Sequence, residues 1–404
     1  MLDEVVITGI GMVDSCGITP TQCWDSLIHD KSQPVNQEPK WPSVIQKRVF
    51  EVPGEEGFRI EGLNDREQRL MPIVQKASIH TIQLALDMAG LSGNAYATCT
   101  YGSLAGPQEL LEFQAASMFD GKVNVNPFKI LYGGKDWTNG FLSTYFKLHG
   151  PSISTTGACA SGLLSIRHAA MLLQTDPDLE YSVAGGSDFG DSAFWRYYFQ
   201  QLRALSMEDS DDCSRPFDKA RNGFILGDGA CAFVVERKKD AIARNATILA
   251  EISSFGAYTE ADHPTDPDIN AVGGIKTMTQ AIKRAGIQAS DIDYINAHGT
   301  STPAGDEAEA LAIHTVFGSD TPVSSNKGHI GHTMAASGLL ETAYSIMAMQ
   351  HGMIPHTGHL RNPLRDDVNF VMHKPMDKPL RYILKNSFGF SGRCVSMVLK
   401  NPNL

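Results

Sequence analysis

The sequence has 404 residues, of which 42% are hydrophobic and 20% are charged, so the chain can bury a sizeable core and is not a disordered polypeptide. It exceeds the length at which one core keeps growing, and two domains or two halves of one large unit are expected. The formal net charge of -11 argues against a nucleic-acid partner, which requires an excess of clustered Lys and Arg.

Seven cysteines are scattered along the chain without the C-x-x-C spacing of a zinc site or a disulfide framework. We therefore expect no catalytic metal, and a reducing compartment fits best. The first residues, MLDE, lead directly into a short apolar strand and do not resemble a secretion signal. No apolar run approaches membrane-spanning length, so we expect a soluble cytoplasmic protein without a membrane partner.

Strands and helices are predicted to alternate along the first half of the chain. Residues 5–11 form a buried strand that ends in a turn, whereas residues 35–65 are irregular. Between residues 67 and 88 the apolar positions fall at helical spacing, and Gly90 closes the segment. This helix is expected to cover a sheet. A second apolar helix is predicted from Leu163 to Leu173.

The rest of the chain continues the alternation of strands and helices. Strands are predicted at 181–184, 230–236, 294–296, 382–385 and 394–400, and helices at 276–285, 306–316 and 333–349. Such alternation favours an α/β architecture with helix-covered sheets. The charged run 237–239 marks a connector, so the boundary is placed near Asn245, giving halves of 1–245 and 246–404.

Cys159 lies among small residues, in the segment 155–162 (TTGACASG), where an extended run turns into a helix. The start of a helix offers unpaired N–H groups and positive dipole character, which favour a thiolate. Cys159 is therefore a candidate nucleophile. A buried free cysteine that serves only as a small apolar residue is the alternative interpretation.

Three further segments carry groups suited to catalysis. Residues 295–303 (INAHGTSTP) place His298 directly after a strand, and residues 324–332 (SSNKGHIGH) supply Lys327 and two histidines. His332 is expected to open a helix, which disfavours the imidazolium and keeps the ring neutral. Residues 386–392 (NSFGFSG) form a glycine-spaced turn in which backbone N–H groups can face a ligand.

Together these segments resemble the β-ketoacyl-acyl carrier protein synthases, types I and II, of the thiolase superfamily. The likeness also includes residues 5–12 (VVITGIGM), 150–154 (GPSIS), 214–218 (SRPFD) and 223–229 (GFILGDG), and so spans nearly the whole chain. It implies the thiolase fold, an α/β body of five layers (α-β-α-β-α) built from two pseudo-duplicated halves, which dimerises.

The resemblance also implies roles for individual residues. Cys159 takes the acyl chain, and His298 and His332 promote decarboxylation of a malonyl unit bound to the carrier protein. The backbone N–H groups of Cys159 and Phe390 form the oxyanion hole. Lys327 corresponds to the family's structural and electrostatic lysine.

Further positions follow from the same likeness. Glu309 and Glu341 are the expected partners of Lys327. Phe390 matches a gating phenylalanine. Contacts with the phosphopantetheine arm and the acyl chain are assigned to Thr300, Thr302, Leu104 and Phe388.

An acyl carrier protein is the implied partner, and no cofactor is implied beyond the phosphopantetheine that carries the substrate. Such carriers are acidic, and Arg66, Arg69 and Arg215 resemble the basic residues that meet them. A local basic patch on a negatively charged body can guide an acidic partner. The dimer is expected to be either a homodimer or a heterodimer with a subunit that resembles a chain-length factor.

The sequence departs from the family at two places. The turn after Phe390 continues as Ser391-Gly392-Arg393-Cys394, and Arg393 can alter the floor of the site. Residues 135–141 (KDWTNGF) are bulkier and more aromatic than in general fatty-acid enzymes. These departures favour a type II polyketide or polyene pathway over general fatty-acid elongation.

Two other functions remain open at this point. The chain can be a non-catalytic partner subunit that shapes the tunnel of an active mate, which the presence of Cys159, His298 and His332 argues against. It can also be a thiolase or a coenzyme A-dependent condensing enzyme, in which Cys394 would serve as a second catalytic cysteine. Cys394 lacks the glycine-flanked motif for that role and is expected to be structural.

Overall fold

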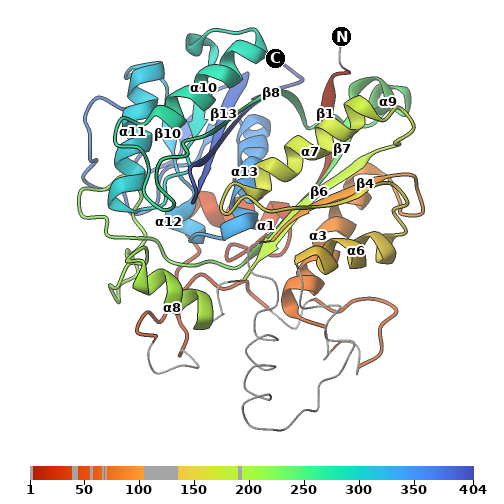
Figure 1. Ribbon diagram of the computed structural model, residues 1–404, viewed down its shortest axis with the longest axis horizontal. Helices are drawn as coiled ribbons and strands as arrows, with labels where there is room; N and C mark the ends of the chain where they lie inside the picture. Colours follow the sequence, from red (N-terminus) through yellow and green to blue (C-terminus); the bar gives the residue numbers. More distant parts are fainter. Residues whose placement is uncertain are drawn as a thin grey trace.

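The computed structural model describes residues 3–38, 44–54, 58–65, 68, 71–103, 135–189 and 193–404. A mixed sheet of ten strands runs through the molecule, in the order β10-β9-β13-β14-β8-β1-β7-β6-β4-β5 (Figure 1). It is made of five strands from each half of the chain. The first five are β1 (Val5–Asp14), β4 (Thr98–Gly102), β5 (Ser152–Thr155), β6 (Ser182–Asp188) and β7 (Gly229–Arg237).

The second half supplies the other five strands. These are β8 (Ala250–Thr259), β9 (Tyr294–Asn296), β10 (Val323–Ser324), β13 (Tyr382–Gly389) and β14 (Arg393–Lys400). When the five strands of each half are numbered along the chain, both halves have the order 3-2-4-5-1. The halves meet where β1 pairs antiparallel with β8, through Val5–Ile7 and Ala250–Ile252. The topology is therefore duplicated within the chain.

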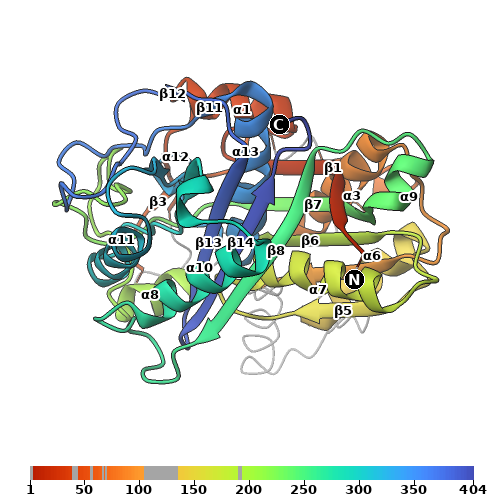
Figure 2. The same ribbon diagram turned by 90° about the horizontal axis from the view of Figure 1, so that it is seen from above.

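Helices cover both outer faces of the sheet and fill the space between its halves. Two central helices, α7 (Ser161–Thr175) and α13 (Ser337–His351), pack against each other and contact strands of both halves. On one outer side lie α3 (Ile73–Ala89) and α6 (Lys135–Phe146), and on the other lie α10 (Val272–Ala285) and α11 (Pro303–Phe317) (Figure 2). This arrangement gives the five layers that the family resemblance implies.

Shorter elements complete the described part of the chain. The helices are α1 (Pro20–Ile28), α8 (Ala193–Gln201), α9 (Lys238–Ala243) and α12 (Lys327–Ile330), with 3₁₀ turns at Ala289–Asp291 and Met334–Ala336. Two small sheets pair β2 (Val35–Asn36) with β3 (Arg48–Val49), and β11 (Met353–Ile354) with β12 (Met376–Asp377). The boundary expected near Asn245 falls between α9 and β8.

The central helices approach each other closely because glycines face the contact. A Cβ atom on Gly162 of α7 would lie 2.8 Å from the Ala335 carbonyl oxygen and 2.9 Å from the Leu339 nitrogen. Since Cβ atoms do not approach other atoms this closely, a larger residue would push α7 and α13 apart. Both helices carry site residues near their first turns, so this contact sets the geometry of the site.

Two sequence predictions need correction, and several elements were not predicted. The predicted helix 67–88 is interrupted, because Gln68 is helical but Met71 and Pro72 are not, and α3 begins at Ile73. Its end at Gly90 is confirmed by a left-handed φ of 66°. The predicted helix 333–349 is broken, because a 3₁₀ turn at residues 334–336 precedes α13. Strand β8 was not predicted, since Ser253, Ser254 and Gly256 dilute its apolar pattern, although its burial alternates in the manner of a strand.

Candidate active site

The candidate catalytic residues follow the carboxyl ends of strands. Cys159 follows β5, His298 follows β9 and Lys327 follows β10. β9 is parallel to β10 and to β13, so the ends of these strands open on one edge of the sheet. In α/β sheets such an edge is where ligands bind. Cys159 comes from the first half of the chain and lines the same cavity as His298 and His332.

Cys159 lies in a tight turn directly before α7. Ala158 adopts a left-handed φ of 50°, and Ser161 fixes the turn by accepting from the Gly157 N–H at 2.8 Å and donating to the Ala158 carbonyl at 2.6 Å. From the other half, the Ser387 hydroxyl donates to the Cys159 carbonyl at 3.0 Å. The cysteine is therefore held on both sides, with 8% of its surface exposed.

His332 faces the cysteine, since its Nε2 lies 3.2 Å from the Cys159 Sγ. On the opposite side of the ring, Nδ1 accepts from the Met334 backbone N–H at 3.2 Å and lies 2.9 Å from the Ser337 hydroxyl. Because Nδ1 is an acceptor, the proton of the neutral ring must be on Nε2. His332 therefore presents an N–H donor to the sulfur.

His298 is oriented in the same way by a different donor. The Lys327 ammonium lies 3.3 Å from the His298 Nδ1 and donates to the His298 carbonyl at 2.6 Å. An ammonium can only donate, so Nδ1 accepts and the proton of neutral His298 is also on Nε2. The two imidazole rings are 5.5 Å apart between centroids and nearly perpendicular, at 81°.

Both imidazoles are neutral at physiological pH. Burial lowers the pKa of His298 and His332 well below the ordinary value, and the Lys327 charge lowers it further. The sequence predicted a neutral His332 for a different reason, the start of a helix. Because α13 begins only at Ser337, burial is the main cause.

Cys159 differs from the expectation of a low pKa. Burial raises the pKa of its thiol to about 12, and the Lys327 charge opposes this effect only in part. α7 does begin at Ser161, two residues later, as the predicted helix start required. In the resting protein Cys159 is therefore a thiol, and the His332 Nε2–H favours the thiolate once it forms.

Lys327 is part of a fully buried charge cluster. Its ammonium pairs with Glu341, as the sequence predicted, and the other oxygen of Glu341 lies 2.7 Å from the Lys385 ammonium. All three side chains have no exposed surface, and burial lowers the pKa of Lys385 to about 8. Sequence reasoning missed Lys385, although a lysine inside an apolar strand signals a buried partner.

The predicted pairing of Glu309 with Lys327 is wrong. Glu309 accepts instead from the backbone N–H groups of His298 and Gly299, at 2.8 and 2.7 Å, and from the Asn386 side chain at 3.1 Å. Glu309 thus holds the backbone that carries His298. Burial raises its pKa above the ordinary value, and these backbone donors act in the opposite direction.

One cavity of ≈ 310 Å³ joins most of the candidate residues. Cys159, His298 and His332 line it together. The Thr300 and Thr302 hydroxyls, which lie 2.9 Å apart, also line it. Further lining residues among the candidates are Glu309, Phe388 and Phe390. Lys327 and Glu341 lie behind this lining, whereas Leu104, Arg66 and Arg69 are outside the described residues.

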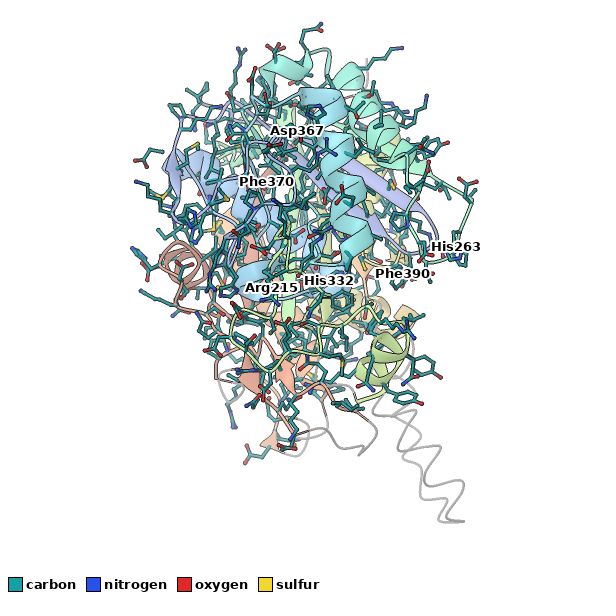
Figure 3. All side chains as sticks on the ribbon, turned by 90° about the vertical axis from the view of Figure 1, so that its left-hand side faces the viewer. Arg215, His263, His332, Asp367, Phe370 and Phe390 are labelled. Carbon is teal, nitrogen blue, oxygen red and sulfur yellow. The ribbon has the colours of Figure 1, made fainter. Side chains whose placement is uncertain are left out.

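Phe390 lies in the hairpin turn between β13 and β14, beside the cavity. Its ring is 6.3 Å from that of Phe199. In the view of Figure 3, Phe390 and His332 lie near the same end of α11. A Cβ on the preceding Gly389 would be 2.8 Å from the Gly157 carbonyl oxygen and 3.2 Å from the Cys159 nitrogen. Glycine here lets the two backbone segments of the expected oxyanion hole come together.

The departures from the family sequence also have positions in the structure. Ser391 adopts a left-handed φ of 66°, a conformation in which glycine would be less strained. Arg393 is half-buried at the start of β14 and does not line the cavity. Cys394 does line it, with Sγ 3.9 Å from Glu260, and burial raises its thiol pKa well above the ordinary value.

Arg215, which the likeness assigns to the contact with a carrier protein, is engaged within its own chain. Its side chain is 12% exposed, pairs with Glu208, lies 3.8 Å from Asp212 and donates to the Ala220 carbonyl at 3.1 Å. These contacts occupy much of its guanidinium group. Arg203, for which no role was expected from the sequence, is exposed and lines the cavity.

Cys159, His298 and His332 also have the composition of a metal site. Their ligand atoms all lie within 4.8 Å of one another. Thiolate and imidazole are zinc ligands, but the raised thiol pKa and the Nε2 protons oppose coordination in the resting state. Within the described part of the chain, no helix has both the length and the apolar character needed to cross a membrane.

Comparisons with known proteins point to one family. The model of the β-ketoacyl synthase N-terminal domain matches residues 2–241, and that of the C-terminal domain matches residues 249–361. The chain is 33% identical over 406 residues to "3-oxoacyl-[acyl-carrier-protein] synthase 2" of Coxiella burnetii, with 98% of each chain covered.

Two solved structures are similar over nearly the full length. A β-ketoacyl synthase from Burkholderia phymatum STM815 is 28% identical, with a TM-score of 0.91 and 99% of both chains covered. The ishigamide ketosynthase/chain length factor is 25% identical, with a TM-score of 0.90 and 99% of this chain and 100% of that chain covered.

Proposed function

We propose that Cys159, His298 and His332 perform the chemistry of this chain, which belongs to the β-ketoacyl synthase family and is an acyltransferase of the 3-oxoacyl-[acyl-carrier-protein] synthase type. The observation that carries this assignment is the 3.2 Å contact between the Cys159 Sγ and the His332 Nε2, in a cavity that His298 also lines. The reaction is a decarboxylative condensation of a malonyl unit with a cysteine-bound acyl chain.

The first step transfers the acyl chain to Cys159. Its sulfur attacks the thioester carbonyl of the acyl carrier protein, the bond from that carbonyl to the carrier sulfur breaks, and the thiol proton ends on the departing phosphopantetheine sulfur. The His332 Nε2–H stabilises negative charge on the attacking sulfur. Since burial favours the thiol, this stabilisation is needed only while the bond forms.

The second step releases carbon dioxide from malonyl bound to the carrier. The bond between the carboxylate and the methylene carbon breaks, and its electron pair forms an enolate whose oxygen carries the charge. The Nε2–H groups of His298 and His332 are the donors proposed to stabilise that oxygen. Neutral imidazoles suit this role, because their ring protons are fixed on the side away from Lys327 and Met334.

In the third step the carbon nucleophile attacks the acyl-cysteine carbonyl. A carbon–carbon bond forms, the bond to the Cys159 sulfur breaks, and the thiolate takes up a proton from solvent. We assign the intermediate oxyanion to the backbone N–H groups of Cys159 and Phe390. The close approach of Gly389 to Cys159 supports this assignment.

The buried charges act as positioning residues. Lys327 fixes the tautomer of His298 and is held by Glu341, which Lys385 also binds. Glu309 holds the His298 backbone. We propose that Thr300 and Thr302 contact the phosphopantetheine arm and that Phe388 and Phe390 contact the acyl chain, because all four line the cavity.

An acyl carrier protein is the proposed partner, and the phosphopantetheine it bears takes the place of a separate cofactor. Arg203 is exposed beside the cavity and is a better candidate for this contact than Arg215. In the described part of the chain β5 is the last strand of the sheet, and it carries an exposed residue at its start, which suits pairing with a second subunit. That subunit is either a second copy or a chain-length-factor-like protein.

Residues 1–245 and 246–404 are the two halves in this proposal, and the chemistry needs both. The pathway is proposed to be type II polyketide or polyene assembly, with fatty-acid synthesis as the other possibility. Incubation of the purified protein with acyl and malonyl carrier proteins tests the function. Condensed product supports a catalytic subunit, whereas inertness both alone and with candidate partner subunits would indicate a non-catalytic one.

A further inference from the structure

A second cluster of ligating side chains lies outside the catalytic cavity. It consists of Asp30, which follows α1, His329 in α12 and His356, which follows β11. The Asp30 Oδ1 is 3.2 Å from the His329 Nδ1 and 3.2 Å from the His356 Nε2. The three atoms lie within 4.8 Å of one another, and the two rings are nearly perpendicular, at 84°. None of the three residues lines the cavity of Cys159.

The hydrogen bonds of His329 leave a lone pair directed at a carboxylate. Its Nε2 lies 3.0 Å from the His356 carbonyl oxygen, which can only accept, so Nε2 must carry a proton. In neutral His329 the Nδ1 is then an acceptor, and it faces the Asp30 Oδ1 at 3.2 Å. Two acceptors at this distance repel each other unless a cation, either a proton or a metal ion, lies between them.

The surroundings have the form of a metal site. A ligating histidine usually donates its other ring N–H to a backbone carbonyl, as His329 does to that of His356. His329 and His356 are only 4% and 5% exposed. The His356 Nδ1 is buried and has no hydrogen-bond partner within the described residues, so it is free to carry the ring proton and leave the Nε2 lone pair for a ligand.

The spacing also fits a transition metal. Zinc bonds to nitrogen and oxygen are about 2.0–2.2 Å long, which separates tetrahedral ligand atoms by about 3.3–3.5 Å. The two 3.2 Å distances from Asp30 are close to this value. The Asp30 side chain is 53% exposed, so water can complete the coordination.

We propose that Asp30, His329 and His356 bind one divalent transition-metal ion of the zinc type, with water as the remaining ligand. The ion would tie the end of α1 and the segment after β11 to α12. Lys327 belongs to the same short helix as His329, and His332 follows it. The site is therefore structural, and it would stabilise the segment that carries two residues of the catalytic centre.

Zinc binding should be measured on the Cys159→Ala protein, because Cys159, His298 and His332 are themselves possible zinc ligands. After treatment with a chelator and removal of the chelator, titration with Zn²⁺ should give one ion per chain and raise the unfolding temperature. Mg²⁺, which prefers oxygen ligands, should not compete. Co²⁺ should give visible d–d absorption without a thiolate charge-transfer band.

Asp30→Ala and His356→Gln, made in the same background, should each weaken Zn²⁺ binding. Loss of a residue that only supports a ligand costs about 10–100-fold in metal affinity, and loss of a ligand should cost at least as much. Asp25→Ala is the matched control, since Asp25 is also 53% exposed, lies on α1 and is 3.1 Å from another histidine, His29. Circular dichroism checks that each variant is folded.

Three results would overturn the proposal: no stoichiometric Zn²⁺ binding, binding that Asp30→Ala leaves unchanged, or binding that Asp25→Ala removes. A failure to bind Zn²⁺ would mean that the cation between the two groups is a proton, in an ion pair of His329 with Asp30.

Discussion

Met334 determines which nitrogen of His332 carries the ring proton. Its backbone N–H donates to Nδ1 at 3.2 Å, so Nε2 is the protonated nitrogen and faces the Cys159 sulfur at 3.2 Å. Lys327 imposes the same tautomer on His298. Two unrelated donors, a backbone amide and an ammonium, therefore produce two equivalent N–H groups. This equivalence is what stabilisation of a single enolate oxygen requires.

Replacing the nucleophile should separate acyl transfer from folding. Cys159→Ala is expected to abolish the acyl-enzyme while the protein stays folded, because the site accepts a slightly smaller side chain. Intact-mass spectrometry after exposure to an acyl carrier protein measures this, with circular dichroism as the check on folding. Cys394→Ala should still acquire the acyl group, and its failure to do so would favour the two-cysteine chemistry of a thiolase.

Removing either imidazole should slow decarboxylation. His298→Ala and His332→Ala are each expected to reduce the release of carbon dioxide from malonyl carrier protein by about 10²–10³-fold, the usual cost of one oxyanion donor. Acylation of Cys159 should persist in His298→Ala, because His298 is not the group in contact with the sulfur. His→Asn variants keep an N–H donor and should recover part of the rate. Full activity of either alanine variant would contradict the assignment.

The backbone contact at Gly389 gives a test of the oxyanion hole. Gly389→Ala would place a Cβ 2.8 Å from the Gly157 carbonyl oxygen and 3.2 Å from the Cys159 nitrogen, so the two segments must separate. We expect the rate of acyl transfer to fall by about 10²–10³-fold. Gly140→Ala is the control, since no atom of the described residues lies within 4 Å of its Cβ position. Equal activity of the two variants would remove the structural basis for the hole.

The buried charge cluster should be costly to break. Glu341→Gln leaves Lys327 and Lys385 without their carboxylate, and all three side chains have no exposed surface. The free energy of unfolding should fall by about 3–5 kcal/mol, measured by urea denaturation. For comparison, Glu38 is 81% exposed and lies 2.7 Å from Lys47, so Glu38→Gln should change stability by less than about 1 kcal/mol.

The raised pKa of Cys159 predicts how its reactivity depends on pH. Only the thiolate reacts with iodoacetamide, and burial puts the thiol pKa at about 12, so the thiolate is a minor species throughout the neutral range. The alkylation rate at Cys159 should therefore rise about tenfold per pH unit between about pH 7 and pH 9. Peptide mass spectrometry can follow it.

Lys327→Met should slow alkylation at every pH, because the Lys327 charge lowers the thiol pKa. A plateau below about pH 9 would show instead that the start of α7 outweighs burial, as the sequence alone suggested.

Much of the site could be read from the sequence because its residues lie in short segments with strong local signals. His298 directly follows a strand predicted at its observed bounds, 294–296. Cys159 does lie at a strand-to-helix turn. Functional groups of α/β proteins commonly follow the ends of strands. Prediction of the strands was therefore enough to identify these residues as candidates.

What could not be predicted depends on contacts between distant residues. Glu309 is separated from Lys327 by a β-strand and turns toward the His298 backbone instead, and no spacing rule reveals this. Burial likewise comes from the whole fold, so the sequence favoured a low thiol pKa where the buried protein has a high one.

The short pairing of β1 with β8 joins two halves of identical strand order, yet the sulfur comes from the first half and both imidazoles from the second. An ancestral half-molecule with this topology would hold either the nucleophile or the proton donors, but not the complete set. The catalytic groups therefore meet at the interface between the two duplicated halves. Because one hydrophobic core is shared by both halves, packing that joins the halves also fixes the distance between the sulfur and the imidazoles.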